Sequence, residues 1–117
     1  MMSQVTIYHN PRCSKSRQTL QLLREQGVEP VVIEYLKTPP TPEQLSEILQ
    51  LLDKNPRDLM RQKEPEYQDN GLDAPNLSQE QLIAAMYAHP ILIERPIVLA
   101  NGKAAIGRPP EKVLEIL

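Results

Sequence analysis

Residues 5–35, VTIYHNPRCSKSRQTLQLLREQGVEPVVIEY, decide the fold. Val5–Tyr8 is typical of a short strand, and the breaker His9-Asn10-Pro11 ends it. The apolar residues after this breaker have helical spacing until Gly27, which suits the position after a helix C-terminus. Residues 31–35 predict a second strand, apolar enough to be buried on both faces. This order predicts a βαβ unit, which is nearly always right-handed.

Downstream of this unit the pattern changes to a block of helices over about residues 41–89. Residues 41–44 and 78–81 each contain a predicted capping box, in which a hydroxyl residue and a glutamine bond each other's backbone N–H. Residues 55–61 predict a shorter helix between these two. Because residues 62–76 are polar and contain Pro and Gly, we expect an ordered loop or a lid there.

The last quarter of the chain predicts a hairpin and a final helix. Asn101-Gly102 separates the apolar runs Ile97–Ala100 and Lys103–Ile106, and this is the strongest short-range hairpin signal. The final helix begins near Pro110, with Val113, Leu114 and Leu117 expected to face inward. The whole order is βαβ, a helical insertion, then ββα. We therefore expect an α/β, thioredoxin-like fold with a mixed four-stranded sheet, in a single domain spanning residues 1–117.

Composition excludes several classes of protein. The 117 residues carry a net charge of −2, which gives no basic field for nucleic acid. Four tyrosines are the only aromatic residues, too few for base-stacking platforms. No apolar run approaches the roughly 20 residues of a membrane span, and the first residues lack the order of an export signal. We therefore expect a cytoplasmic protein with no nucleic-acid or membrane partner. We also expect a monomer, although composition does not determine the oligomeric state.

Cys13 is the only cysteine, and it lies where the first strand gives way to the first helix. Free N–H groups and the positive end of the helix dipole stabilise an anion there, and Arg12, Lys15 and Arg17 add positive charge nearby. Thiolate pKa values at such positions fall from about 8.5 into a range of about 3.5–7.5. One cysteine forms no intramolecular disulfide, so redox chemistry requires a thiol from another molecule. The alternative is a small buried hydrophobic residue.

The loop around Cys13 also predicts an oxyanion site. The hydroxyls of Ser14 and Ser16 and the guanidinium of Arg17 are candidate donors beside the free backbone N–H groups. His9 is a candidate for orienting Cys13 or accepting its proton, because histidine titrates near neutral pH. His9 is equally interpreted as a loop residue that caps the strand. No Cys/His zinc spacing is present, so we expect no metal.

Three arginines elsewhere in the chain are further candidates for oxyanion binding. Arg95 and Arg108 each precede a proline beside the predicted hairpin, one before and one after it, so both are placed to face the same end of the sheet. Arg61 ends the predicted short helix. The planar donors of arginine suit a multiply charged oxyanion, although the alternative for each is a solvated surface charge. Pro96 is also a candidate cis-proline.

With these residues, the chain resembles the glutaredoxin-coupled arsenate reductase family, in its short single-domain bacterial branch. The resemblance spans essentially the whole chain and is most specific in residues 7–17 and in Arg95-Pro96-Ile97-Val98, with further matches at residues 59–61 and 107–109. It implies a thioredoxin-like fold, arsenate as substrate, glutathione as co-substrate, glutaredoxin as partner and no bound cofactor.

The resemblance also implies roles for individual residues. By position, Cys13 matches the nucleophile that forms a thiolate–arsenate adduct, and His9 matches a histidine that helps keep the thiolate ionised. Arg61, Arg95 and Arg108 match the arginines that hold the oxyanion. The loop departs from well-characterised arsenate-resistance members, which have alanine before the cysteine and Gly-Thr after it. A bulkier, more basic loop would alter access to the thiol or the choice of substrate.

Two alternatives to arsenate reduction remain. One is a thiol oxidoreductase on the same scaffold that acts on glutathione mixed disulfides or on another oxyanion. The other is a redox-sensitive regulator that binds RNA polymerase, as in a related thioredoxin-like family. Members of that family typically carry a CxxC switch, and Ser16 stands at the second position here, which argues against this alternative.

Overall fold

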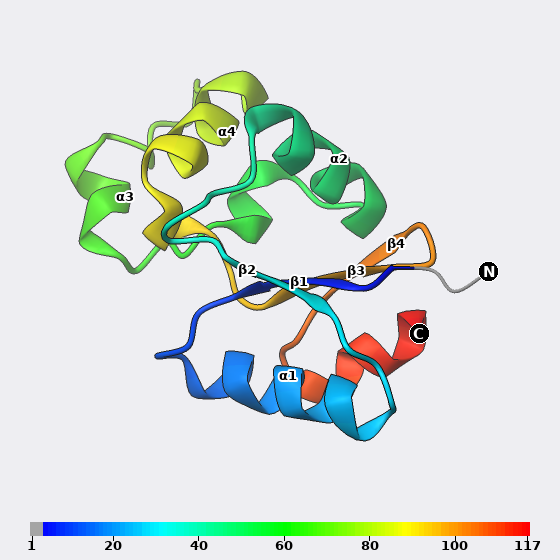
Figure 1. Cartoon of the computed structure of the whole chain (residues 1–117). Coiled ribbons are helices and arrows are strands. Elements are labelled where there is room, and N and C mark those ends of the chain that lie inside the picture. Colours follow the sequence, from blue (N-terminus) through cyan, green and yellow to red (C-terminus); the bar gives the residue numbers. More distant parts are fainter. Residues whose placement is uncertain (1–3) are drawn as a thin grey trace. The chain divides into compact units, whose positions relative to one another are not determined.

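The computed structural model describes residues 4–117, which form two compact units (Figure 1). The first unit combines the chain up to Thr38 with Arg95–Leu117, and the second is Pro39–Glu94. The first unit contains β1 (Thr6–His9), α1 (Ser14–Glu25), β2 (Val31–Glu34), β3 (Ile97–Ala100), β4 (Lys103–Ile106) and the 3₁₀ helix η3 (Pro110–Ile116). The second contains α2 (Pro42–Leu52), η1 (Pro56–Leu59), α3 (Pro65–Asp69), α4 (Gln79–Ala88) and η2 (Pro90–Leu92).

The first unit is built on a mixed four-stranded sheet in the order β2-β1-β3-β4. β1 pairs parallel with β2 and antiparallel with β3, and β3 pairs antiparallel with β4. α1 and η3 lie side by side on one face of this sheet (Figure 1). The element order and the mixed sheet confirm the predicted α/β, thioredoxin-like class.

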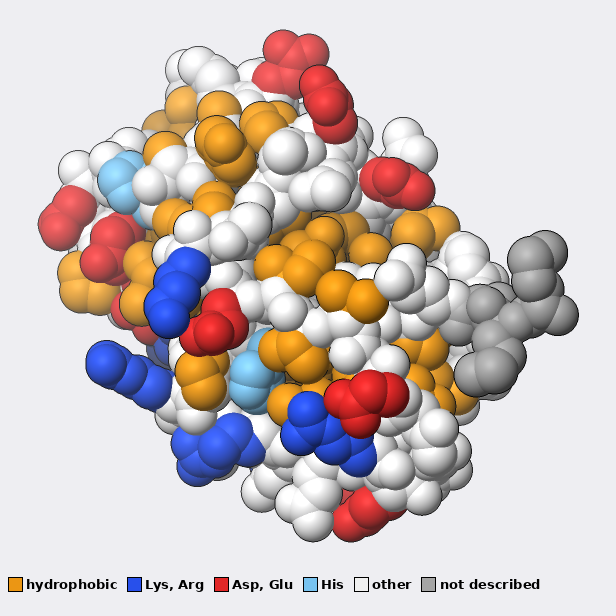
Figure 2. Space-filling model, in the orientation of Figure 1, with side chains coloured by type: hydrophobic (Ala, Val, Ile, Leu, Met, Phe, Trp, Pro, Cys, Tyr) orange, Lys and Arg blue, Asp and Glu red, His pale blue; other side chains and the backbone are white. Residues whose placement is uncertain are grey.

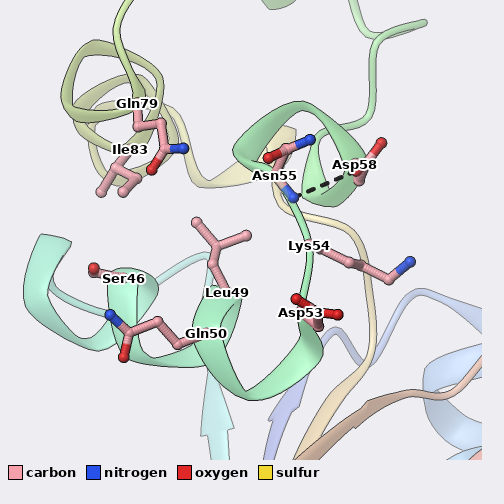
Figure 3. Close-up of a pocket in the computed structure, with 9 residues that line it drawn as sticks. All are labelled: Ser46, Leu49, Gln50, Asp53, Lys54, Asn55, Asp58, Gln79 and Ile83. Carbon is pink, nitrogen blue, oxygen red and sulfur yellow. Dashed lines mark hydrogen bonds between the residues drawn. The ribbon is translucent and has the colours of Figure 1, made fainter.

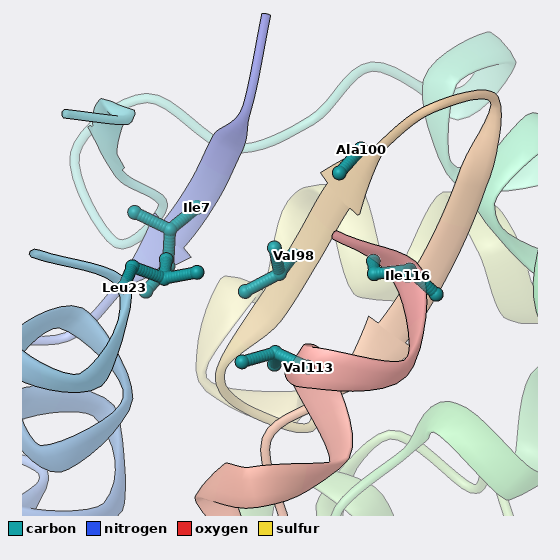
Figure 4. Packing of buried hydrophobic residues seen from close by; sticks show 6 residues of the cluster. All are labelled: Ile7, Leu23, Val98, Ala100, Val113 and Ile116. Carbon is teal, nitrogen blue, oxygen red and sulfur yellow. The ribbon is translucent and has the colours of Figure 1, made fainter. Parts of the chain in front are cut away.

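The core of the first unit joins the two central strands to the two helices. Six buried side chains form it (Figure 4): Ile7, Leu23, Val98, Ala100, Val113 and Ile116. Fully burying a large aliphatic side chain stabilises a fold by about 1.5–3 kcal/mol. This packing fixes β1, β3 and α1 against one another. It therefore also fixes the loop between β1 and α1 and the segment that enters β3.

The predicted burial of the second strand on both faces is wrong. Val31 and Val32 of β2 are 41% and 39% exposed. The reason is that β2 lies at the edge of the sheet, where, among residues 4–117, β1 is its only neighbouring strand. An apolar run is equally compatible with an edge and a centre, and only the strand order separates them.

The final helix differs from its prediction in which side chains face inward. Val113 is buried as expected, but Leu114 and Leu117 are 38% and 40% exposed. Pro110 and Ile116 are buried instead. Residues 110–116 form a 3₁₀ helix, in which side chains three apart lie on one face, whereas the expected set assumed the α-helical period.

The hairpin and the cap after α1 confirm their predictions. Asn101 and Gly102 have φ values of 56° and 71°, as the two central residues of a type I′ turn require. Gly27, just beyond α1, has a φ of 78°. Since few residues other than glycine adopt that conformation, the helix ends where the sequence predicts.

The second unit confirms both capping boxes and corrects the loop between them. Thr41 and Ser78 cap α2 and α4 with reciprocal glutamine bonds. The shorter helix is a 3₁₀ turn that ends at Leu59 rather than reaching Arg61. Residues 62–76, expected as a loop or lid, contain α3, and a further 3₁₀ turn, η2, comes after α4. Tyr67 of α3 and Leu72 are both buried, so two apolar side chains anchor a segment whose composition is otherwise polar.

Within residues 4–117, no helix is long and apolar enough to cross a membrane. The same residues contain no group of three or more His, Cys, Asp or Glu side chains arranged to hold a metal ion. The description of the chain as a single domain stays a prediction.

Candidate active site

Cys13 is the N-cap residue of α1, at the end of a tight turn. Its φ and ψ of −93° and 123° are extended, so the chain turns from loop into helix at this residue. The Cys13 N–H donates to the Asn10 carbonyl at 3.0 Å, and the Arg12 N–H donates to Asn10 Oδ1 at 3.0 Å. Cys13 is 8% exposed. The turn therefore places a nearly buried thiol at the open N-terminus of the helix.

The pKa of the Cys13 thiol lies below its ordinary value because several groups together outweigh burial. Burial raises the pKa, whereas the backbone N–H of Ser16, the positive charge of Arg95, a hydrogen bond from Arg95 and the backbone N–H of Lys15 lower it. Two of these groups are the free N–H donors that a helix start supplies. A lowered pKa increases the fraction of nucleophilic thiolate at neutral pH.

Arg95 and Arg108 reach the thiol from the two ends of the hairpin. Arg108 Nη2 lies 3.9 Å from Cys13 Sγ, and Arg108 Nε donates to the Arg95 carbonyl at 2.8 Å. Arg95 comes shortly before β3 and Arg108 shortly after β4, and these two antiparallel strands end side by side. The structure thus brings Arg95 and Arg108 together at Cys13, and the two arginines lie at the same end of the sheet, as the hairpin pattern predicts.

The approach of Arg108 depends on the small residue before it. A Cβ on Gly107 would lie 2.5 Å from Thr19 Oγ1 and 2.8 Å from Pro96 Cγ, too close for any side chain. Glycine thus lets the chain pass between α1 and the segment entering β3. The Arg95–Pro96 and Arg108–Pro109 peptide bonds are both cis, which confirms Pro96 as a cis-proline.

His9 contacts Ser16 directly. His9 Nδ1 and Ser16 Oγ are 2.6 Å apart, and the Asn10 N–H donates to the same hydroxyl oxygen at 3.0 Å. Burial, with the charges of Arg24 and Arg17, lowers the pKa of His9, and Glu34 opposes this. His9 is therefore a neutral imidazole near pH 7. Its contact Ser16 has a backbone N–H that lowers the Cys13 pKa, and a role of His9 in the chemistry stays a prediction.

The other predicted donors in the loop have different surroundings. The fully buried Ser16 hydroxyl is engaged by His9 and Asn10. Arg17 Nη1 donates to the Pro11 carbonyl at 3.0 Å. Ser14 is exposed, and its side chain makes no hydrogen bond with the described residues. Sequence reasoning anticipated free N–H groups here but missed the Asn10 turn, whose signal is the Asn-Pro pair.

Arg61 belongs to the second unit, where its guanidinium is held by its own neighbours. Arg61 Nη2 lies 2.6 Å from Glu64 Oε1, and Nη1 donates to the Ile91 carbonyl at 3.4 Å. Both side chains of the ion pair are about one fifth exposed. The role of Arg61 in oxyanion binding stays a prediction.

The second unit also contains a cavity of about 440 Å³ between α2, η1 and α4 (Figure 3). Leu49 and Ile83 point into it, and amide and carboxylate side chains such as Gln50 and Asp53 surround them. No cysteine, histidine or arginine lines it. The nucleophile and the arginines beside it lie elsewhere, so this cavity is not the candidate active site.

The arrangement around Cys13 suits nucleophilic attack on an oxyanion. A thiol with a lowered pKa supplies the nucleophile, and two guanidinium groups beside it supply planar donors that match a tetrahedral anion. Backbone N–H groups at the start of α1 add donors that need no reorganisation. These groups are chemically suited to a reaction between one thiol and one multiply charged anion.

Comparison with known proteins identifies the family. A model of the ArsC family matches residues 8–116. Uncharacterized protein YfgD of Escherichia coli (strain K12) is 59% identical over 118 residues, covering 100% of this chain and 99% of that protein. An arsenate reductase of Neisseria meningitidis serogroup B (strain ATCC BAA-335 / MC58) is 50% identical over 117 residues, covering 99% and 100%. The solved structure of arsenate reductase from Vibrio cholerae matches with a TM-score of 0.96 and 54% identity over 100% of both chains. This chain belongs to the ArsC family.

Proposed function

We propose that this protein reduces arsenate to arsenite, with Cys13 as nucleophile, glutathione as reductant and glutaredoxin as the protein that regenerates the thiol. The observation that carries the proposal is the grouping of Arg95 and Arg108 at the Cys13 sulfur. Relatives that cover the whole chain at about half identity and are named arsenate reductase support the same substrate.

The first step joins arsenate to the enzyme. The Cys13 thiolate attacks arsenic, so that a sulfur–arsenic bond forms and one arsenic–oxygen bond breaks. The departing oxygen takes up protons and leaves as water, and arsenic remains As(V). Arg95 and Arg108 hold the oxyanion and the adduct. Their charge stabilises the anion as negative charge builds up during attack.

The second step transfers two electrons to arsenic. A glutathione thiolate attacks the Cys13 sulfur of the adduct, a sulfur–sulfur bond forms, and the sulfur–arsenic bond breaks with its electron pair left on arsenic. As(V) thereby becomes As(III), which takes up protons and leaves as arsenite, while the two sulfurs are oxidised to a mixed disulfide. A glutaredoxin thiolate then attacks the glutathione sulfur and returns Cys13 as thiolate. This sequence explains how a chain with one cysteine completes a redox cycle.

The remaining residues of the site have supporting roles in this proposal. The backbone N–H groups of Lys15 and Ser16 stabilise the thiolate before attack. His9, neutral near pH 7, orients the loop through Ser16. Glutathione and glutaredoxin are available in a reducing compartment, so the proposed chemistry fits a protein that acts in the cytoplasm.

The test is a coupled assay that follows arsenate-dependent NADPH oxidation with glutathione, glutathione reductase and glutaredoxin. We expect turnover by the wild type and none by Cys13→Ser, because a hydroxyl at this position is not ionised at neutral pH. Full activity in Cys13→Ser would contradict the proposed nucleophile. No turnover by the wild type, beside an active control reductase, would contradict arsenate as substrate and favour a thiol oxidoreductase that acts on glutathione mixed disulfides.

A further inference from the structure

Arg12 and Lys15 lie on either side of Cys13 in the sequence, and both are exposed. Within residues 4–117, neither side chain makes a hydrogen bond or an ion pair. Two exposed cations of the same unit are paired, by contrast, since Arg24 lies 3.4 Å from Glu29 and Lys37 lies 3.7 Å from Glu34. The two cations beside the thiol are therefore available to a molecule that approaches Cys13.

Glu34 is an acidic group near this loop, since its charge acts on His9, and it pairs with Lys37. The first 24 residues include no Asp or Glu, and the first turn of α1 has no acidic residue. In Figure 2, Lys and Arg side chains gather around the turn that leads into α1. A protein with a net charge of −2 thus carries a local positive surface at its reactive cysteine.

The Cys13 thiolate has stabilising groups other than the Arg12 and Lys15 side chains. The groups that lower the Cys13 pKa are the backbone N–H groups of Ser16 and Lys15 and the side chain of Arg95, and neither the Arg12 nor the Lys15 side chain is among them. The oxyanion, in turn, has Arg95 and Arg108 at the sulfur. Other groups thus stabilise the Cys13 thiolate and bind the oxyanion. Arg12 and Lys15 therefore suit the binding of the thiol co-substrate, which reacts second.

We propose that Arg12 and Lys15 bind the carboxylates of the thiol co-substrate and select a small thiol that carries negative charge. The proposal deepens the proposed function and rests on it, since it concerns the reductant of that same site. Glutathione carries two carboxylates and one ammonium group, and its sulfur must reach the Cys13 sulfur. Arg12 directly precedes Cys13 and Lys15 comes two residues after it, so the loop offers one guanidinium and one ammonium group, which can each match one carboxylate.

A thiol–disulfide exchange tests this proposal without arsenate. The Cys13 thiolate attacks oxidised glutathione, a bond forms between Cys13 and one glutathione sulfur, and the other glutathione leaves as thiolate. The rate is compared with that for 2-hydroxyethyl disulfide, which is uncharged. Because both reagents oxidise the same sulfur, the ratio of the two rates isolates the contribution of the carboxylates.

The variant is the double substitution Arg12→Ala and Lys15→Ala, and Lys103→Ala with Lys112→Ala is the matched control. The control removes the same charge from exposed lysines of β4 and η3 in the same unit. We expect the rate with oxidised glutathione to fall by roughly three- to twentyfold in the test variant, since exposed ion pairs contribute only modestly. The rate with the uncharged disulfide and both rates of the control should stay within about twofold of wild type. The difference between the wild type and the test variant in the rate with oxidised glutathione should become smaller in high salt.

Three results would overturn the proposal. Equal losses with both disulfides would mean that the substitutions changed the thiol rather than carboxylate binding. An unchanged rate with oxidised glutathione would mean that the carboxylates bind elsewhere or not at all. A loss seen only when glutaredoxin is present would assign the two cations to a protein partner. Failure of the proposed function is distinguishable, because it would abolish arsenate turnover and leave the charge-dependent exchange intact.

Discussion

The tripeptide Asn-Pro-Arg occurs twice in the chain, at residues 10–12 and 55–57. The two arginines differ in exposure and in hydrogen bonding. Arg12 is exposed and makes no side-chain hydrogen bond with the described residues. Arg57 donates to Tyr67 Oη at 2.6 Å, to the Leu72 carbonyl at 2.6 Å and to the Ala74 carbonyl at 2.5 Å. The same three residues thus present a cation to the surroundings in one unit and use it as an internal clamp in the other.

The difference comes from the part of the chain beyond each tripeptide. Residues 10–12 form the turn before α1, whereas Asn55 is the N-cap of η1, and in both tripeptides the asparagine carbonyl accepts the N–H three residues on. Cys13 comes after the first tripeptide, and among the described residues no loop carbonyl bonds the Arg12 side chain. Asp58 comes after the second, and residues 65–74 fold back to place their oxygens around Arg57. A local motif therefore specifies the backbone turn, whereas distant oxygens decide whether its arginine is structural or available to a ligand.

The largest expected effect is the loss of stability on removing Arg57, the arginine that is hydrogen-bonded inside the second unit. Arg57→Ala removes the donor for a hydroxyl and two carbonyls that are partly buried. We expect the free energy of unfolding to fall by about 2–4 kcal/mol, because unpaired polar groups are left behind. Urea denaturation measures this. Arg24→Ala, which breaks an exposed ion pair, is the matched control and should cost less than about 1 kcal/mol. Equal losses of unfolding free energy in both variants would contradict a structural role for the hydrogen bonds of Arg57.

A second prediction concerns an arginine that touches the thiol. Arg95→Ala removes a charge and a hydrogen bond that lower the Cys13 pKa, so the pKa should rise toward its ordinary value. Losing a charge-assisted contact to the oxyanion costs about 1.5–3 kcal/mol, which is roughly a ten- to hundredfold loss of arsenate turnover. The pH profile of Cys13 alkylation measures the pKa, and the coupled assay measures turnover. Arg12→Ala, which removes the exposed arginine of the first tripeptide, is the control. It should leave the pH profile of Cys13 alkylation unchanged. A profile that moves with Arg12 rather than Arg95 would reverse these assignments.

Sequence patterns predicted the features that depend on neighbouring residues. The capping boxes at Thr41 and Ser78, the Asn101-Gly102 turn and the position of Cys13 at a helix start are all local. The meeting of Arg95 and Arg108 was also predictable, because a hairpin brings the residues before and after it together.

Features that depend on tertiary context were missed. The exposure of Val31 and Val32 results from strand order, which no apolar run encodes. The burial of Ile116 in place of Leu117 results from a 3₁₀ period that side-chain spacing alone does not separate from an α-helical one. The bond between the Ser16 hydroxyl and His9 requires β1 and α1 to be packed together. In each case the deciding atom lies outside the local stretch of sequence.

The smallest expected effect concerns His9, which precedes the first tripeptide and is buried. Its pKa is lowered in the folded chain, chiefly by burial. Above the unfolded value of about 6.5, both states are neutral, and His9 adds no pH dependence. As pH falls below that value, the unfolded chain binds the proton first, so stability is lost on acidification. One proton limits the slope to about 1.4 kcal/mol per pH unit.

His9→Gln should therefore flatten the decline of the free energy of unfolding between about pH 7 and pH 5. Urea denaturation across this range compares the slopes of the variant and the wild type, and His89→Gln controls for the loss of an imidazole as such. The absolute stability of His9→Gln also changes, because its bond to Ser16 is lost, so only the slope is informative. A variant as steep as the wild type would show that His9 takes up its proton equally in both states. Burial beside Ser16 would then not be the cause that keeps this imidazole neutral next to the reactive loop.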